Sequence, residues 1–358
     1  MIDSIEKLQC LVREGVTDFK EYGHVRTFFN EEKTLIGFDY TPEAEYEGTW
    51  NYFERISRGL VLEVETGEIV ARPYDKFFNL GQHNAYPKSK IKYVMDKADG
   101  SLGIIFNYKG ETYVNTRGSF VSEQAKWATD YCRRNGIKAD SGFTLLCEII
   151  YPDNRIVVNY GGWEGLILHG CRVNSTGEYL SLSVLSMAFH NEICADVVRV
   201  IEVFPITTLT AAKAFVDMLS GTEAEGVVVL DKDGERFKIK GEDYLRLHRL
   251  VTDVTPKRVW EIMCAGNYDA HKDQIPDEFI DEVEEYRKEI QEWVDKHTQE
   301  AKLLVERSPK DVSQKEFALW VNQQEPMYRP YLFQHRQGRD VSNFFLPLWK
   351  KMTGYHGA

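Results

Sequence analysis

Three features that this sequence lacks narrow what the chain can be. Its six cysteines lie far apart and form no Cys-x-x-Cys pair, which argues against a zinc site or a disulfide framework and for reduced thiols. No apolar run reaches the roughly 20 residues that a membrane span requires, and the first residues lack the layout of a signal peptide. Basic residues are not in excess, since the formal net charge is −12. These absences predict a cytoplasmic protein that is not bound to a membrane.

The charge is unevenly distributed along the 358 residues. Residues 71–120 carry eight Lys and Arg against four Asp and Glu, although the whole chain is acidic. Distribution decides the local field more than the total does, so a basic site within an acidic protein is compatible with ATP and a phosphate-bearing substrate. The length and the ordinary composition, 43% hydrophobic and 28% charged, predict about two domains with a large core.

Hydrophobic patterns divide the chain into two parts. Alternating and apolar runs typical of strands continue to about residue 240, with helices expected at 5–12, 122–134, 183–200 and 209–219. From about Tyr244 helical patterns replace them, with helices expected at 276–306 (Pro276 in the first turn and Phe279 in the apolar stripe), 313–322 and 341–351. We therefore predict an α+β fold with a domain over residues 1–245 and an all-helical domain over residues 246–358.

The stretch around Lys97 carries the strongest chemical signal. Asp96-Lys97-Ala98-Asp99-Gly100 joins two β-rich runs, so a lysine stands at a strand end before a glycine turn that lets backbone approach a ligand closely. A lysine amine can attack phosphorus and divide one difficult transfer into easier steps, provided that cationic neighbours help to keep it uncharged. An ordinary hairpin turn is the alternative, because Asp, Gly and Ser are common turn residues.

Several other charged residues are candidates, each with an ordinary alternative. Arg58 opens an apolar strand and Lys76 precedes Phe77 and Phe78, but either could be a solvated cation at a strand edge. Glu148 interrupts an apolar run, which is costly unless the carboxylate is paired or binds a ligand, and a sheet-edge salt bridge would explain it as well.

Lys238 and Lys240 alternate along a predicted strand. They therefore share one face, where like charges repel unless an anion lies between them. A triphosphate would be such an anion, and a solvated strand face is the alternative.

The order of these features resembles the motif series of the ATP-dependent RNA ligases, which are covalent nucleotidyltransferases. The similarity is greatest to the branch of bacteriophage RNA ligase 1, the tRNA-repair enzyme of T-even phages, and it spans about residues 50–248. The motifs in order are Arg58-Gly59, Lys76, Lys97-Ala98-Asp99-Gly100, Arg117-Gly118, Glu148, Glu225-Gly226 and Lys238-Ile239-Lys240. Supporting stretches are Arg72-Pro73-x-x-Lys76-Phe77-Phe78-Asn79, Pro152-x-Asn154-Arg155-Ile156-Val157 and Thr176-Gly177-Glu178-Tyr179.

The resemblance implies a role for each motif residue. Lys97 is implied as the nucleophile that becomes adenylylated, and Lys238 and Lys240 as contacts of the α-phosphate. Glu148 is implied to hold the ribose and Glu225 to be associated with a divalent metal, by resemblance magnesium, which suits hard oxygen ligands. The triphosphate or RNA phosphates are implied to contact Arg58, Lys76 and Arg117, and the nucleotide site also includes Asp99 and Gly100. Arg117 stands where the relatives may carry Lys, and the two side chains differ in donor geometry.

The resemblance further implies a fold, a reaction and partners. The fold is an ATP-grasp-like ligase domain of antiparallel sheets flanked by helices, followed by an all-α domain that is a candidate for RNA specificity. The reaction passes AMP from ATP to Lys97, then to an RNA 5′-phosphate, and a 3′-hydroxyl then displaces it. The expected partner is RNA with such ends, broken tRNA among them, and the expected protein is a monomer in the cytoplasm, or in the host-cell cytoplasm if phage-encoded. A catalytically inert nucleotide- or RNA-binding module on the same fold, a DNA ligase and a GTP-dependent capping enzyme stay open as alternatives.

Overall fold

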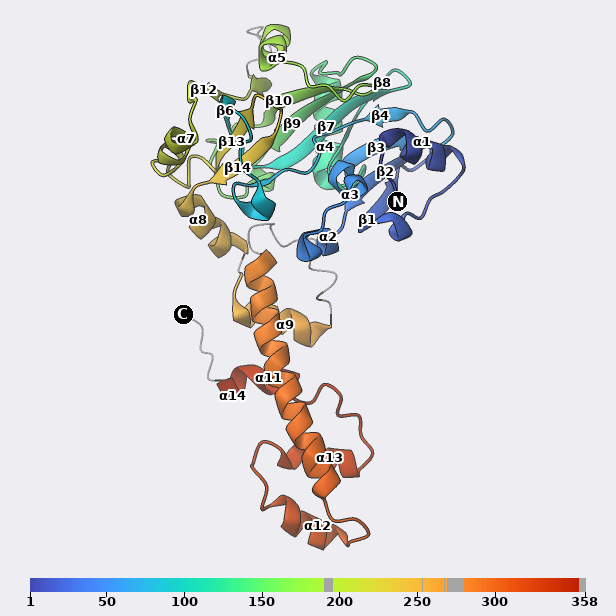
Figure 1. Ribbon diagram of the computed structural model, residues 1–358, viewed down its shortest axis with the longest axis vertical. Helices are drawn as coiled ribbons and strands as arrows, with labels where there is room; N and C mark the ends of the chain where they lie inside the picture. The colour runs from blue at the N-terminus through green and yellow to red at the C-terminus, as the bar shows by residue number, and fades with distance from the viewer. Residues whose placement is uncertain (190–195, 253, 267, 269–279, 354–358) are drawn as a thin grey trace. The chain divides into compact units, whose positions relative to one another are not determined.

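Three β-sheets make up the first part of the chain in the computed structural model (Figure 1). Residues 1–189, 196–252, 254–266, 268 and 280–353 are described. The chain divides into two units, Met1–Val251 and Thr252–Ala358. Mainly antiparallel sheets with helices between their strands are followed by a helical part, and the expected α+β class is confirmed.

The N-terminal sheet is built from neighbouring strands in chain order. The strands β1 (Val25–Phe29), β2 (Leu35–Tyr40), β3 (Arg58–Glu63) and β4 (Ile69–Ala71) pair antiparallel. Helix α1 (Ile5–Arg13) begins at Ser4, whose side chain accepts a hydrogen bond from the Lys7 amide, and places Leu8 and Val12 in the core of this sheet. The 3-10 turn η1 (Lys20–Tyr22) and the short helices α2 (Pro42–Glu47) and α3 (Tyr52–Ile56) complete this region.

Two five-stranded sheets follow, and the chain passes from one to the other at Lys97. The first has the order β12 (Val203–Phe204), β6 (Ile91–Asp96), β13 (Gly226–Asp231), β14 (Arg236–Lys240) and β5 (Phe78–Asn79). The second has the order β11 (Val198–Val200), β10 (Gly165–Val173), β9 (Phe143–Ile150), β7 (Ser101–Tyr108) and β8 (Glu111–Asn115). Pairing is antiparallel except for β14 with β5 and β10 with β11. The end of β6 and the start of β7 therefore lie on either side of residues 97–100, which we call the lysine turn.

Helices cover these sheets and bury the apolar runs that the sequence showed. Helix α4 (Glu123–Arg134) places Ala128 and Tyr131 against the core of the second sheet, and α7 (Leu209–Val216) places Ala212 against the first. Helix α5 (Leu182–Phe189) and the 3-10 turns η2 (Gln82–Asn84) and η3 (Pro152–Asn154) lie in the connections. Helix α8 (Glu242–Thr252) follows β14 directly.

All the regular secondary structure described in the second unit is helical. It contains α9 (Pro256–Ala265), α11 (Ile280–Arg307), α12 (Gln314–Val321), α13 (Arg329–Arg336), η6 (Leu346–Leu348) and α14 (Trp349–Thr353). Helix α11 buries an apolar stripe that includes Val283, Ile290 and Val294, and α13 lies alongside it (Figure 1). None of the described helices is long and apolar enough to cross a membrane.

Two of the expected helices differ from the structure. Residues 198–200, expected at the end of a helix, form β11, because their backbone pairs in parallel with the edge of β10. The helix expected at 341–351 begins as a 3-10 turn at Leu346, and residues 341–345 are not helical. The start of the long helix that was expected at Pro276 and Phe279 lies outside the described residues.

Candidate active site

Lys97 stands in the turn between the two five-stranded sheets. Its backbone amide donates to the Gly226 carbonyl at 3.0 Å, which fixes the end of β6 against β13. Its side chain is 21% exposed, and its Nζ lies 2.6 Å from Oε2 of Glu225. The structure thus brings together a lysine and a carboxylate that are 128 residues apart in sequence.

Glu225 connects two lysines across this site. Its Oε1 lies 2.7 Å from Nζ of Lys240 while its Oε2 contacts Lys97, and its side chain is 3% exposed. Burial alone would raise the pKa of Glu225, but the charges of Lys97 and Lys240 outweigh burial, so its pKa lies below the ordinary value. Glu225 is therefore a buried carboxylate that stays ionised between two ammonium groups.

Gly226 permits this approach because a larger residue would not fit. Its φ of +150° lies in a region that L-residues rarely adopt, and a Cβ added there would meet the Ile239 carbonyl oxygen at 2.1 Å. Gly100 is similarly confined, since an added Cβ would lie 2.6 Å from the Ile149 carbonyl oxygen. Gly100 in the lysine turn and Gly226 at the start of β13 therefore both occupy positions where a side chain would clash.

Asp99 holds the lysine turn rather than facing an open site. Its Oδ2 accepts from the amides of Val157 and Val158 at 2.9 and 2.8 Å, and its Oδ1 accepts from the Tyr244 hydroxyl at 2.7 Å. Its own amide donates to the Tyr160 hydroxyl at 2.8 Å. With 2% of Asp99 exposed, these bonds tie the turn to the segment after η3 and to α8. The expected nucleotide contact of Asp99 stays a prediction.

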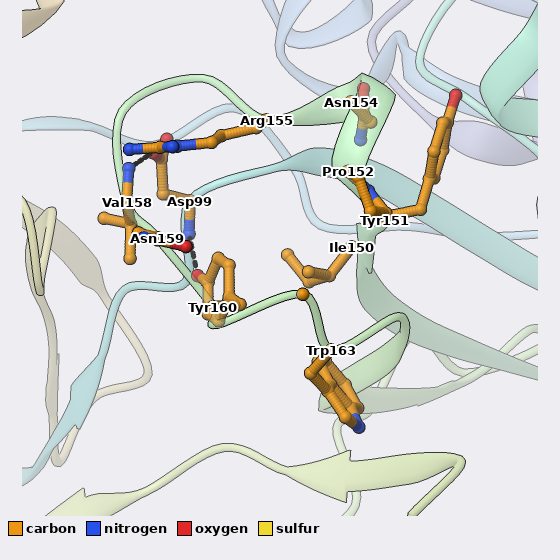
Figure 2. Close-up of a pocket in the computed structure, with 11 residues that line it drawn as sticks. Asp99, Ile150, Tyr151, Pro152, Asn154, Arg155, Val158, Asn159, Tyr160 and Trp163 are labelled. Carbon is orange, nitrogen blue, oxygen red and sulfur yellow. Dashed lines mark hydrogen bonds between the residues drawn. The ribbon is translucent and has the colours of Figure 1, made fainter.

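A cavity of about 200 Å³ lies beside this anchor (Figure 2). Its aromatic lining comes from Tyr151, Tyr160 and Trp163, and its polar lining includes Asn154 and Arg155. Figure 2 shows the hydrogen bond between the Asp99 amide and the Tyr160 hydroxyl at one wall of the cavity. The lysine turn and this cavity therefore share a wall.

Glu148 and Lys238 occupy the two sheets on either side of the lysine turn. Glu148 lies in β9, opposite Leu102 and Ile167, and its Oε2 is 3.6 Å from Nε2 of His169, which is too long for a hydrogen bond. Lys238 lies in β14 two residues before Lys240, and its Nζ is 6.0 Å from the centre of the Phe77 ring. The expected strand that carries both lysines is confirmed. The anion that lies beside Lys240 is the carboxylate of Glu225.

Lys76 is enclosed in an aromatic and acidic setting. It is buried, it forms an ion pair with buried Glu45, and its Nζ lies 4.8 Å and 5.0 Å from the ring centres of Tyr40 and Trp50. A phosphate contact by Lys76 stays a prediction, and it would require the Glu45 ion pair to open.

The two predicted arginines lie in different surroundings. Arg58 packs over Phe77 at 5.5 Å, and its buried Nη1 has no hydrogen-bond partner in the described part of the chain. Arg117 places Nε 3.0 Å from Oδ1 of fully buried Asp39 and donates from Nη1 to the Tyr40 hydroxyl at 2.9 Å. Arg58 is therefore available to an anion, and Arg117 is held by a carboxylate of the N-terminal sheet.

The chemistry of the donors fits a magnesium ion only in part. Glu225 offers hard oxygens, but both contact lysine ammonium groups. Within the described residues there is no group of three His, Cys, Asp or Glu that could hold a metal ion. Magnesium in phosphoryl-transfer sites is held by one or two carboxylates together with substrate phosphates and waters. Glu225 could be such a carboxylate once a nucleotide supplies further oxygens.

Several residues that position this site were not predicted from the sequence. They are Asp39, Glu45, Tyr160 and Tyr244, and each contacts a predicted residue from a distant segment. Only Tyr244 carried a local signal, because it follows Lys240 by four residues at the point where strand patterns end.

Comparison with known sequences agrees with this geometry. Residues 56–245 match the model of a family described as RNA ligase. This chain belongs to the RNA ligase family. The match includes the lysine turn, Glu148, Glu225 and both lysines of β14, whereas strands β1 and β2, with Asp39, and helix α2, with Glu45, precede it.

The individual relatives are similar to only part of this chain. A protein of Thermovibrio ammonificans named "Putative RNA ligase" is 33% identical over 138 residues, 36% of each chain. RNA ligase 1 of bacteriophage TS2126 is 29% identical over 141 residues, 34% of this chain and 35% of its own. The chain thus spans about a third of the length of the curated relatives that it matches.

A solved structure of the Naegleria gruberi RNA ligase, a mutant with ATP and Mn, is similar over 46% of this chain and 53% of its own. Its identity is 21% and its TM-score 0.36, values too low to carry a conclusion about this family member.

Proposed function

We propose that this chain is an ATP-dependent RNA ligase that joins RNA 3′-hydroxyl and 5′-phosphate ends through a lysyl-AMP at Lys97. The observation that carries the proposal is the cluster of Lys97, Glu225 and Lys240 at the turn between two sheets, within the stretch that matches the RNA ligase family. ATP with a divalent metal, by expectation magnesium, would be the co-substrate. Cleaved tRNA is the substrate that the resemblance to the phage enzymes favours.

In the first step, the Lys97 amine attacks the α-phosphorus of ATP. A nitrogen–phosphorus bond forms while the phosphorus–oxygen bond to pyrophosphate breaks, and pyrophosphate leaves with that electron pair. Next, an oxygen of the RNA 5′-phosphate attacks the same phosphorus and releases Lys97. Finally, the RNA 3′-hydroxyl attacks the activated 5′-phosphate, AMP leaves and the phosphodiester is complete. Each step redistributes negative charge around phosphorus, so fixed cations provide most of the stabilisation.

The ion pair of Lys97 constrains the first step. Attack on phosphorus requires a free Lys97 Nζ, so the lysine must leave its contact with Glu225 at 2.6 Å before it can react. Lys240 contacts the other oxygen of Glu225 at 2.7 Å, so the buried carboxylate keeps a cationic partner when Lys97 moves away. The structure therefore shows Lys97 paired with Glu225, and this pair has to open before the proposed attack on ATP.

A test is to incubate the full chain with ATP and magnesium and to measure its intact mass. The expected result is a mass increase equal to one AMP, which is lost in Lys97→Ala. Lys92→Ala is the matched control, because Lys92 is exposed on the strand that leads to Lys97 and should still be labelled. An unmodified wild type, or label retained by Lys97→Ala, would contradict the proposal.

The helical residues after about 246 are proposed to select the RNA. Their sequence offers no catalytic constellation, and contacts that read the shape of a folded RNA need surface beyond the reactive end. Ligation of a nicked tRNA stem-loop, compared with an unstructured oligonucleotide, measures that selection.

A further inference from the structure

A second cavity, of about 440 Å³, lies at the start of β7 and includes the loop after β8. Its lining is mainly polar or cationic and contains no acidic side chain: Arg26, Ser101, Leu102, Thr116, Arg117, Gly118, Ser119 and Gln124. The cavity is large enough for a ligand of nucleotide size. Its chemistry is that of an anion site.

Two arginines in this cavity are held by one buried carboxylate. Nη2 and Nε of Arg26 lie 2.9 and 3.2 Å from Oδ2 of Asp39, and Nε of Arg117 lies 3.0 Å from Oδ1 of the same residue. Asp39 is fully buried, whereas the side chains of Arg26 and Arg117 are 43% and 31% exposed. The group therefore carries one net positive charge, with its guanidinium groups fixed and facing a cavity.

The backbone is shaped to allow this arrangement. A Cβ added to Gly118 would lie 2.7 Å from Arg26 Nη2 and 2.9 Å from Asp39 Oδ2, so only glycine lets the Arg26–Asp39 pair reach the loop after β8. Ser101 Oγ donates to Asn154 Oδ1 at 2.9 Å, and Gln124 Nε2 lies 3.4 Å from the same oxygen. Asn154 also lines the cavity of Figure 2 and therefore links the two cavities.

The cavity shares only Arg117 with the residues expected to contact the triphosphate or RNA phosphates. Neither Lys238 nor Lys240 lines it, since both lie in β14 of the other five-stranded sheet. Its strands are β7 and β1, and β1 precedes the stretch that matches the RNA ligase family. Arg26 therefore adds to this cavity a cation that lies outside the stretch matching the RNA ligase family.

We propose that this cavity, with Arg26 from the N-terminal sheet, binds a phosphate group of the RNA strand beside the lysine turn. The inference rests on the proposed ligase function, because it is that function which brings an RNA phosphate to Lys97. The ligand is either the terminal 5′-phosphate or an internal phosphodiester of single-stranded RNA, and both present the same oxygens to a bidentate guanidinium.

The test uses the full chain without ATP and measures binding of two fluorescent oligoribonucleotides of one sequence, with and without a 5′-phosphate. Arg26→Gln should weaken binding about tenfold and reduce the salt slope by about 0.7, the loss of roughly one phosphate contact to single-stranded RNA. If Arg26→Gln binds both probes more weakly, the ligand is an internal phosphodiester. If it binds only the phosphorylated probe more weakly, the ligand is the terminal 5′-phosphate. Lys33→Gln is the matched control, since it removes an equal exposed charge from the turn at the far end of the same hairpin.

Gln124→Glu supplies a second variant that keeps the Arg26–Asp39 pair. It puts a carboxylate into the cavity and should weaken RNA binding at least as much, with an unchanged melting temperature. Labelling of each variant with ATP in the absence of RNA separates the two proposals. A wild type that is never labelled refutes the ligase function. If the wild type is labelled but neither cavity variant changes RNA binding, the RNA site is refuted. The RNA site is also refuted if the variants lose labelling to the same extent as RNA binding, because the cavity would then be a nucleotide site.

Discussion

Asp96 and Glu225 both lie close to Lys97, but the fold shifts the pKa values of their carboxyl groups in opposite directions. Burial raises the pKa of Asp96 to about 6, against the opposing effect of the Lys97 backbone amide. Burial acts in the same direction on Glu225, but two lysines reverse the result and its pKa is lowered. The difference is that Glu225 has ammonium groups at both oxygens, at 2.6 and 2.7 Å. An ionised carboxylate therefore costs stability at position 96 and contributes stability at position 225.

We expect Asp96→Asn to stabilise the protein at pH 8 and not at pH 4. The native pKa of about 6 exceeds the ordinary 3.8, so the native state binds the proton more tightly and stability falls as the pH rises through this window. A pKa difference of about two units corresponds to about 3 kcal/mol of unfolding free energy, which the neutral amide should recover at pH 8. Urea unfolding at both pH values measures this, with exposed Asp153→Asn as the control. An equal effect of Asp96→Asn at both pH values would count against it.

Lys240→Ala and Lys238→Ala should each slow adenylylation of Lys97 by about 10²–10³, the usual effect of removing one positioned charge contact to a transition state. Only Lys240→Ala should also lower the melting temperature, because it takes one of two lysines from buried Glu225. Single-turnover labelling with ATP measures the rate. Lys232→Ala, at the exposed turn between β13 and β14, is the control. If both strand variants react at the wild-type rate, the two lysines do not contact the nucleotide.

At the scale of elements, the pairing of β13 with β14 determines where Glu225 and Lys240 meet. Gly226 lies opposite Lys240, and Val228 lies opposite Lys238. Since β13 also pairs with β6, the strand that ends at Asp96, a shift of either register would separate Lys97 from its carboxylate. The site is thus a property of strand register as much as of its side chains.

Gly226→Ala should disturb that register and Gly241→Ala should not. The first places a Cβ 2.1 Å from the Ile239 carbonyl oxygen at a φ of +150°, and the second meets its nearest neighbour, the Val216 carbonyl oxygen, at 3.7 Å. Backbone strain of this kind costs about 1–3 kcal/mol. We therefore expect a lower melting temperature and lost labelling for Gly226→Ala alone. Equal behaviour of the two variants, measured by thermal unfolding and intact mass, would argue against a special role of Gly226.

The sequence predicted those elements whose patterns are local. The β-rich runs on both sides of Lys97 and the alternation of Lys238 and Lys240 are visible within a few residues, and both became strands. The three-residue β11 was missed because it exists through parallel pairing with β10. The burial of Lys76 was also missed, since its partner Glu45 belongs to a charged six-residue helix that resembles a solvated segment. Long-range contacts of single residues leave no periodic signal.

At the scale of the whole molecule, the division into Met1–Val251 and Thr252–Ala358 separates the proposed chemistry from the helical unit. Every candidate residue, from Arg58 to Lys240, lies in the first unit, as does Tyr244 of α8, which donates a hydrogen bond to Asp99. The first unit therefore contains the full set of groups that the proposed reaction needs from the protein.

A fragment of residues 1–252 should still be labelled at Lys97 and join unstructured RNA ends, because it keeps α8 and the Tyr244–Asp99 hydrogen bond. It should lose preference for a nicked tRNA stem-loop, since shape-selective contacts need the surface of the second unit. Ligation rates of fragment and full chain on both substrates give the comparison. An equal loss on both, with a lowered melting temperature, would mean that the helical unit supports stability only.

The anchoring of Asp99 also bears on how the protein is made. A ribosome releases the chain from its N-terminus, so Lys97 emerges long before Glu225, 128 residues later, and Asp99 long before Tyr244, 145 residues later. Contacts of such sequence separation form late in folding, because the entropy of closing the intervening loop opposes them. A nascent chain that has not yet produced residue 244 consequently carries its lysine in an unanchored turn. The surroundings of the proposed nucleophile are thus completed only near the end of synthesis of the first unit, once residue 244 has been made.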